Sequence, residues 1–387
     1  MRLSVRPANA SREDKRTSNQ QVEMKKPARL DALTGLRSFA AVNIVLFHFS
    51  NPNWFGPLAP VVNAGYASVS FFILLSGFVL GYNYNARARA GQLETKRFYE
   101  ARFTRLYPIY LLSLTLAFKM LSLEWESHTH PMFWTGVVLS PLLLQGWIPE
   151  IATFLNTPAW TMSAESFYYV LFPWMARWKR PGHVGPHLAK MGLVWMLGLV
   201  PGTLYVMYNP DGIMHIDRFS YGKWLQALKY TPIPHLASFV FGVLLAELDE
   251  LVPRMGKRRL VVGIFGFVAT FAILTQAHRL PYPLLHDGFF MPLFGCIIIG
   301  LAGINPMSKL FGLRPLVFVG EASYCLYLLH FNLWNMIHDS HVLDHLRLAR
   351  FDPWISYLLL IGMALLALHF IEKPAQRILR GWMHVWR

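Results

Sequence analysis

The chain has 387 residues, of which 54% are hydrophobic and only 15% are charged. A soluble domain of this length needs far more charged surface, so the composition excludes a soluble globular protein and indicates a polytopic membrane protein. The formal net charge of +15 could suggest nucleic-acid binding, but Lys and Arg concentrate in the N-terminal segment and in loops between apolar runs. We therefore expect membrane lipids, and no nucleic acid, among its partners.

The N-terminal segment differs in composition from the rest of the chain. Residues 1–29 hold eight Lys or Arg and three acidic residues, and they contain no apolar run. A cleavable signal peptide has a short basic start followed by an apolar core, which does not fit this segment. We predict a cytoplasmic, basic, disordered tail at 1–29, one membrane domain at 30–375, and a cytoplasmic C-terminal tail at 376–387.

Eleven apolar segments follow one another along the chain. They are 36–51, 65–84, 106–123, 132–147, 166–178, 190–207, 231–247, 260–276, 288–304, 316–336 and 354–371. If all eleven crossed the membrane, the basic loop 177–190 would lie outside, against the positive-inside rule. Treating 132–147 as a re-entrant segment returns every basic loop to the cytoplasm. The expected fold is an all-α polytopic membrane helix bundle of about ten transmembrane helices, with both termini in the cytoplasm.

The first apolar segment carries Arg37 and His48, eleven residues apart. Eleven helical steps return to within about 20° of the starting direction and rise roughly 16 Å, so one helix face carries both side chains. With Arg37 at the membrane boundary, His48 lies about halfway through a core roughly 30 Å thick, where an ionisable group is costly. A hydrogen-bonded packing histidine is the alternative, but we favour a general base.

Two further arginines, Arg102 and Arg105, lie three residues apart at the expected cytoplasmic start of the third span. They share a helix face, where two guanidinium groups form a fork that suits phosphate. A helix N-terminus adds a favourable dipole for an anion. Snorkelling of both side chains to the membrane surface is the alternative.

A carboxylate, Glu165, opens the fifth span in the sequence Trp160 to Tyr169. It could orient a histidine or a sugar hydroxyl. An interfacial helix cap explains it equally well, because acidic residues favour the first turn of a helix.

A polar stripe follows in a later span, where Ser323, Tyr327 and His330 have i, i+4 and i+7 spacing. Such a stripe must face the interior of the bundle. An interhelical hydrogen-bond network is one explanation for it, and a functional site is the other.

Three other residues have structural explanations. Glu372 precedes Pro374, which we expect to stop the last span, so a cap or an ion pair accounts for this carboxylate. Cys296 and Cys325 both fall in apolar segments, so neither a disulfide framework nor a cysteine-based metal site is supported. We predict no metal site.

Six short motifs stand in an order that resembles acyltransferase family 3, the bacterial integral-membrane O-acyltransferases that modify surface glycans and some small molecules. They are Leu33 to Arg37 running on to His48, Ser76-Gly77-Phe78, Arg102 and Arg105 followed by Tyr107-Pro108, Trp160 to Tyr169, Gly320 to His330, and Glu372-Lys373-Pro374. The resemblance covers about residues 30–375.

The resemblance implies a ten-helix bundle in the bacterial inner membrane that uses cytoplasmic acyl-CoA, commonly acetyl-CoA, as a co-substrate. His48 matches the family's essential histidine, Arg37 its paired arginine, and Arg102 and Arg105 its Arg-x-x-Arg motif linked to the donor. The family also has a re-entrant segment near the third span. One departure is Ser70, which stands where the family often has an aspartate; another is Ser38, in place of a glycine.

Together these observations give a hypothesis for the reaction. Arg102 and Arg105 anchor CoA, and His48 acts as a general base or as an acyl-carrying nucleophile. Arg37 stabilises charge on the thioester oxygen or holds a CoA phosphate. The acceptor is a hydroxyl of a glycan or lipid-linked sugar, with a small metabolite as the alternative.

We assign acceptor positioning to Glu165, Tyr327 and His330. A transporter or flippase for lipid-linked sugar is the rival function, and it predicts internal repeats or paired broken helices, which the sequence lacks. A membrane scaffold is a third possibility, but it has no use for Arg37 and His48 on one face.

Overall fold

The computed structural model describes residues 30–254 and 256–385, and over this part of the chain every regular element is a helix. The expected tail at 1–29 lies outside the described residues. The longer helices are α1 (Asp31–Phe49), α3 (Gly65–Arg89), α4 (Thr95–Leu116), α7 (Trp160–Met175), α8 (Val184–Tyr208), α10 (Pro232–Leu251), α11 (Lys257–Thr275), α13 (Met291–Ala302), α16 (Ser323–Asp339), α18 (Trp354–Ala367) and α19 (Lys373–Val385).

Short helices connect and flank these elements. They are α2 (Ala59–Asn63), α5 (Leu121–Ser127), α6 (His130–Leu139), α9 (Lys223–Tyr230), α12 (Tyr282–His286), α14 (Pro306–Phe311), α15 (Arg314–Glu321) and α17 (Val342–His345). Single 3₁₀ turns cover Pro52–Leu58, Ala117–Met120, Gln145–Trp147, Pro149–Ile151, Thr157–Ala159, Ala277–Arg279 and Ala349–Phe351, and a π-helical turn covers Leu368–Glu372.

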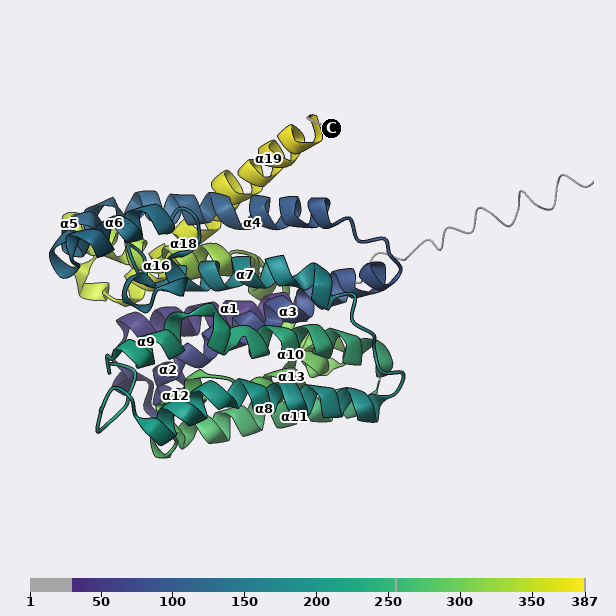
Figure 1. The fold of residues 1–387 in the computed structure, drawn as a ribbon. Helices are drawn as coiled ribbons and strands as arrows, with labels where there is room; N and C mark the ends of the chain where they lie inside the picture. Colours follow the sequence, from purple (N-terminus) through teal and green to yellow (C-terminus); the bar gives the residue numbers. More distant parts are fainter. Residues whose placement is uncertain (1–29, 255, 386–387) are drawn as a thin grey trace, which may run out of the picture.

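Apart from α19, which projects obliquely from the bundle, the long helices run roughly parallel or antiparallel to one another between two ends (Figure 1). We call one the basic end, because the connections 90–94 and 176–183 and residues 252–254 lie there beside the arginine-rich helix termini. The distal end carries α2, α5, α9 and α12. The described chain begins at the basic end, and its last helix, α19, projects away from the bundle (Figure 1).

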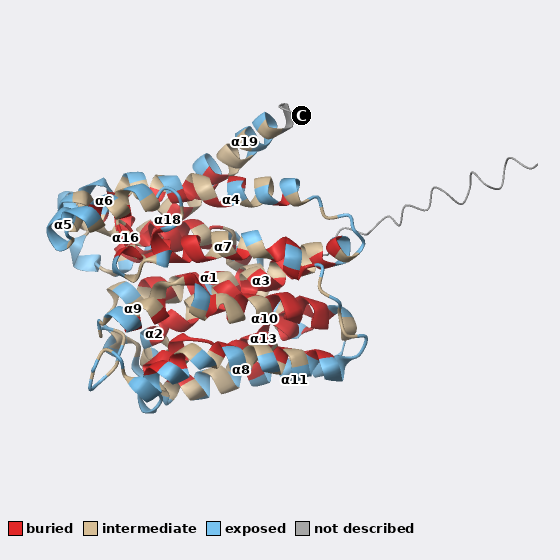
Figure 2. Cartoon of the chain, viewed as in Figure 1, coloured by how far each residue is buried: buried red, intermediate tan, exposed pale blue. Residues whose placement is uncertain are grey.

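The centre of the bundle is the pair α3 and α10, which pack backbone to backbone. A Cβ atom on Gly77 would overlap the carbonyl oxygen of Phe239, and one on Gly242 would overlap the carbonyl oxygen of Leu74. Close approach through small residues is how membrane helices gain packing energy where lipid removes the hydrophobic driving force. Figure 2 shows the buried residues concentrated along these helices and α13.

The outer helices α8 and α11 carry many exposed and half-buried residues (Figure 2). The apolar side chains of Leu193, Leu197, Val261 and Phe265 are 58–63% exposed. Apolar rows of this length on a helix surface suit lipid and not water. The chain is therefore a multi-pass membrane protein, as its composition indicated.

Eight helical segments of the described chain are long and apolar enough to cross a membrane, or nine if the bent pair α15 and α16 counts as one span. The remaining expected span, 166–178, corresponds to α7, which has only 16 residues. The all-α membrane bundle is confirmed. The segment that precedes α7 in the chain explains why this helix is short.

That preceding segment enters the bundle from the distal end and returns to the same end. At the tip of its path, the hydroxyl groups of Tyr107 and Tyr110 donate to the carbonyl oxygens of Pro141 and Ser140. Tyr107 is the thirteenth of the 22 residues of α4, so the tip lies about halfway along that helix. The chain then returns to Glu150, whose carbonyl oxygen contacts His128 at 3.1 Å.

This path is the re-entrant segment expected near 132–147. It also explains the length of α7, because Ser163 near the start of α7 donates to the carbonyl oxygen of Leu143 at the tip. The re-entrant segment occupies the distal half of the position that a full-length helix would fill, and α7 occupies the other half.

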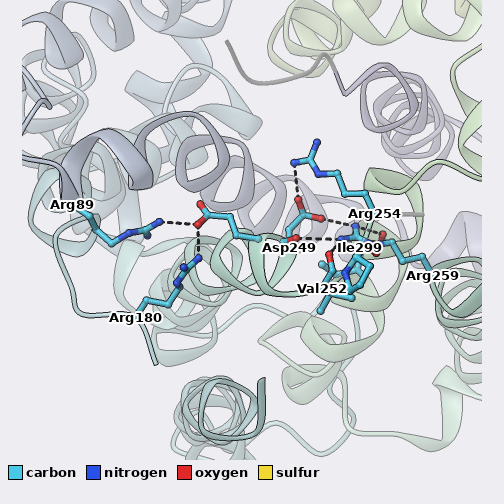
Figure 3. A network of polar contacts seen from close by, with 9 residues as sticks. Arg89, Arg180, Asp249, Val252, Arg254, Arg259 and Ile299 are labelled. Atoms are coloured by element: carbon cyan, nitrogen blue, oxygen red, sulfur yellow. Dashed lines mark hydrogen bonds and ion pairs between the residues drawn. The ribbon is translucent and has the colours of Figure 1, made fainter. Parts of the chain in front are cut away.

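At the basic end, a buried arginine joins three helix termini (Figure 3). Arg259, at the start of α11, is 2% exposed and forms an ion pair with Asp249 of α10 at 2.6 Å. The same guanidinium donates to the carbonyl oxygens of Pro253, Val252 and Ile299. Nearby, Arg89 and Arg180 both pair with Glu250, which ties α3 and the start of α8 to α10.

We expect Arg259→Ala to lower the stability of the protein by about 3–5 kcal/mol, because the substitution leaves Asp249 buried with part of its charge uncompensated. The measurement is the unfolding midpoint of the detergent-solubilised protein. Arg258→Ala is the matched control, since Arg258 is exposed on the same turn. Equal midpoints for the two variants would show that the buried cluster does not hold the helix termini together.

Candidate active site

A cavity of about 870 Å³, its mouth included, lies between α1, α3, α4, α7 and α16. Its lining includes five of the predicted site residues: Arg37, Arg102, Arg105, Glu165 and Tyr327. These residues come from four helices that are distant in sequence. The sequence assigned them to separate tasks, and the fold brings them to one place.

The cavity is rich in positive charge. Arg102 carries a buried Nε atom without a partner, and none of the three guanidinium groups forms a hydrogen bond or ion pair with another described residue. Arg37 and Arg105 are close enough to repel each other. Arg37 and Arg102 are half-buried and Arg105 is exposed. Three guanidinium groups without partners around one cavity make a site for an anion.

The one carboxylate in the cavity lining is Glu165, and it accepts a hydrogen bond from the Tyr169 hydroxyl at 2.8 Å. The Tyr169 oxygen lies 3.5 Å from Ser76 Oγ of α3. Glu165 is the sixth residue of α7, beyond the first turn, so the structure excludes the helix-cap interpretation. Its contact with a tyrosine at i+4 keeps it pointed at the cavity.

The polar stripe of α16 faces the interior, as predicted. Ser323, Tyr327 and His330 are 1%, 8% and 0% exposed. Ser323 and Tyr327 line the cavity, and the His330 ring lies beyond them, 6.1 Å from the Tyr327 ring between centroids. The stripe therefore leads from the cavity toward the distal end.

His48 lies at the far end of this stripe. Its ring centroid is 5.3 Å from that of His330 and 4.6 Å from that of Phe331. Arg37 in the cavity and His48 at His330 both face α16, so the shared helix face is present.

The depth inferred for His48 was wrong. Because α1 begins at Asp31, Arg37 already lies inside the helix, and His48 falls in its last turn at the distal end instead of halfway along.

Two other local expectations were wrong for a related reason. Helix α4 begins at Thr95, so Arg102 is its eighth residue and receives no benefit from the helix N-terminus. The helical structure of the last span also does not end at Pro374. It continues through a π-helical turn into α19, which contains the expected tail from residue 376 onward. Glu372 accepts hydrogen bonds from Cys325 and Gln376, in line with a structural role.

Comparison with known proteins identifies the family. The acyltransferase domain of family 3 matches residues 30–369, nearly the whole chain. The chain belongs to acyltransferase family 3. It is therefore an acyltransferase of the membrane, and the arginine-lined cavity with its histidine neighbours is the best candidate for its active site.

Three curated relatives illustrate the range of the family. Acyltransferase MdmB of Streptomyces mycarofaciens is 29% identical over 91% of this chain and 92% of its own length. Peptidoglycan O-acetyltransferase OatA of Listeria monocytogenes is 25% identical over 89% of this chain but only 56% of its own length. OatA of Staphylococcus aureus is 21% identical, and 58% of it is matched. The chain thus spans little more than half of the OatA proteins. No solved structure gives a significant match.

The departure from the family pattern at Ser70 has a structural counterpart. Ser70 Oγ donates to the carbonyl oxygen of His286 at 3.0 Å, and the next residue, Asp287, is fully buried. Neither Asp287 oxygen has a hydrogen-bond partner among the described side chains, and Oδ1 lies 3.9 Å from Nδ1 of His235. A carboxylate is therefore present close to Ser70, on a different element.

Sequence reasoning missed this group, because nothing in the spacing of His235 and Asp287 brings them together. It also missed the part played by Tyr169, for which a signal existed. Tyr169 stands four residues after Glu165, the spacing at which two side chains on one helix meet.

Proposed function

We propose that the protein moves an acyl group, most simply acetyl, from cytoplasmic acyl-CoA to a hydroxyl of a surface or exported glycan. The observation that carries this proposal is the cavity with three unpaired guanidinium groups. Among acyl donors, CoA presents phosphate groups, which Arg binds with two parallel hydrogen bonds. Arg102 and Arg105 hold the donor phosphates, and Arg37 adds a third positive charge on the opposite wall.

The distance along α1 supports an extended donor. Eleven helical residues separate Arg37 from His48, about 16 Å along the helix axis. A compact anion could not reach both ends of this path. CoA bound by its phosphates extends its arm along the polar stripe of α16, past Tyr327, and brings the thioester to His48.

At the distal end His48 activates the acceptor hydroxyl. It takes the proton of the acceptor hydroxyl while the oxygen attacks the thioester carbonyl, and the departing CoA thiolate receives the proton. The alternative is attack by the imidazole itself, with an acyl-imidazole intermediate. Glu165, Tyr327 and His330 position the reactants in this scheme.

The orientation follows from the positive-inside rule. The basic end faces the cytoplasm, where CoA is available, and the distal end faces outward in the bacterial inner membrane. The name of the Listeria relative supports a glycan acceptor. MdmB, matched over most of its own length, is named only as an acyltransferase, so a small metabolite is the alternative acceptor.

The test is transfer of radiolabelled acetyl from acetyl-CoA by membranes that contain the wild-type chain. We expect alkali-labile label in the glycan fraction, since base hydrolyses an ester. Label in a soluble metabolite would show that the acceptor is a small molecule and that the reaction is still acyl transfer. If label stayed in CoA with every donor tested and a lipid-linked sugar still crossed the membrane, the flippase would be the better explanation.

A further inference from the structure

His330 is a neutral imidazole whose tautomer is set by the backbone. Its Nδ1 atom contacts the carbonyl oxygen of Tyr327, one turn earlier on α16. A carbonyl oxygen only accepts hydrogen bonds, so Nδ1 carries the proton. The other nitrogen, Nε2, is then a bare acceptor.

That acceptor has no partner. Nε2 is buried without a hydrogen bond, and the His330 side chain is 0% exposed. An unsatisfied buried acceptor costs about 1–3 kcal/mol, so such an atom in a native structure needs an explanation. Packing does not explain it, because a phenylalanine would fill the same volume without this cost.

The ring that faces His330 is His48. The centroids are 5.3 Å apart with 33° between the planes. Phe49 and Phe331 pack against the buried His330 ring, whereas His48 is exposed. A centroid separation of 5.3 Å brings nitrogens that point at each other to about 3 Å, the length of a hydrogen bond. His48 forms no hydrogen bond with any described residue, so rotation of its ring can direct either nitrogen toward His330.

We propose that His330 is the positioning residue for His48, accepting a hydrogen bond from the His48 ring through its bare Nε2 atom. This contact fixes the tautomer and the orientation of His48. The other His48 nitrogen then presents its lone pair to the acceptor hydroxyl, the arrangement a general base requires.

The contact also serves the reaction step. When His48 takes the hydroxyl proton it becomes an imidazolium, and its N–H bond toward His330 becomes a stronger donor. The proton passes on to the CoA thiolate, and His48 returns to its starting tautomer. His330 keeps its own proton on Nδ1 throughout.

Other charged groups near the pair do not replace this partner. Arg218, in the loop between α8 and α9, donates to the carbonyl oxygen of Phe47 and stacks on the Phe47 ring. Partial burial lowers the pKa of Arg218, yet this guanidinium remains a cation and can only donate. The Tyr327 ring centroid lies 6.1 Å from that of His330, farther than the 5.3 Å to His48. His330 Nε2 is the buried, unpaired acceptor beside His48.

Three substitutions separate this role from packing. His330→Gln places an oxygen near the position of Nε2 and keeps an acceptor. His330→Asn mimics Nδ1 and leaves nothing near Nε2, and His330→Phe fills the ring volume only. This inference rests on the proposed acyl transfer. We expect kcat to fall about 10- to 100-fold in the Asn and Phe variants and to recover in the Gln variant, with KM for acetyl-CoA unchanged.

The matched control is His338→Phe on the same helix, because His338 makes the same contact to a carbonyl oxygen one turn earlier but directs Nε2 to Asp352. Equal loss in the Gln, Asn and Phe variants, or no loss in Phe, would overturn the positioning role. Absence of transfer by the wild-type chain would instead count against the proposed function.

A second readout does not need the acyltransferase reaction. Diethyl pyrocarbonate modifies an unprotonated imidazole nitrogen, and mass spectrometry locates the modified residue. We expect His48 to react faster in the wild-type chain than in His330→Phe, with the Gln variant close to wild type. The same rate in all three would contradict a hydrogen bond between the two histidines, even if the Phe variant had lost activity through misfolding.

Discussion

Replacing His48 with alanine should lower kcat for acetyl transfer by about 10²- to 10⁴-fold, the usual effect of removing a general base. KM for acetyl-CoA should change little, because the cavity that holds the donor phosphates lies about 16 Å away along α1. The measurement is the rate of label transfer at saturating donor, with membrane insertion checked by the amount of full-length protein.

The control for this variant is His341→Ala. His341 also lies at the distal end, but its side chain is 73% exposed and pairs only with Asp344. Full transfer by His48→Ala would remove this residue from the mechanism. Incubation with labelled donor alone then separates the two chemical roles, because a nucleophile leaves an acyl group on His48 and a base leaves none.

Replacing both Arg102 and Arg105 with alanine should weaken the binding of acetyl-CoA instead of slowing the chemical step. A hydrogen bond to a charged group contributes about 1.5–3 kcal/mol, so loss of two such anchors should raise KM for acetyl-CoA about 10²-fold or more. The rate at saturating donor should fall much less than in His48→Ala. Substitution by lysine should restore only part of the affinity, since lysine keeps the charge but not the fork of donors.

Lys96→Ala combined with Arg97→Ala is the matched control. It removes two positive charges from the same helix, but both residues are exposed and Arg97 pairs with Glu94 at the surface. An equal rise in KM for the two double variants would mean that general attraction of an anionic donor, and not the cavity, accounts for the effect.

The sequence predicted the layout of the bundle well, because the membrane imposes strong constraints on composition. Apolar length and the distribution of Lys and Arg were enough to identify the re-entrant segment at 132–147. Helix ends were predicted less well. Nothing in the composition indicates that α4 begins as early as Thr95 or that a π-helical turn carries the last span through Pro374 into α19.

For the candidate site, the sequence predicted which side chains take part but not which of them lie next to one another. Spacing within one helix predicted the inward stripe of α16 and the shared face of Arg37 and His48. It could not predict that Arg37 faces Arg102 and Arg105 across a cavity, since that depends on how α1 packs against α4 and α7. The pair of His235 and Asp287 was missed for the same reason.

The tip of the re-entrant segment has a consequence for where lipid can lie against the protein. Backbone carbonyl groups at membrane depth are tolerated only where protein or water satisfies them. The carbonyl oxygens of Ser140, Pro141 and Leu143 are satisfied by tyrosine and serine hydroxyl groups from α4 and α7. The same segment exposes Val138 and Leu142 at 59% and 60%, so its outer face suits lipid while its carbonyl groups stay paired.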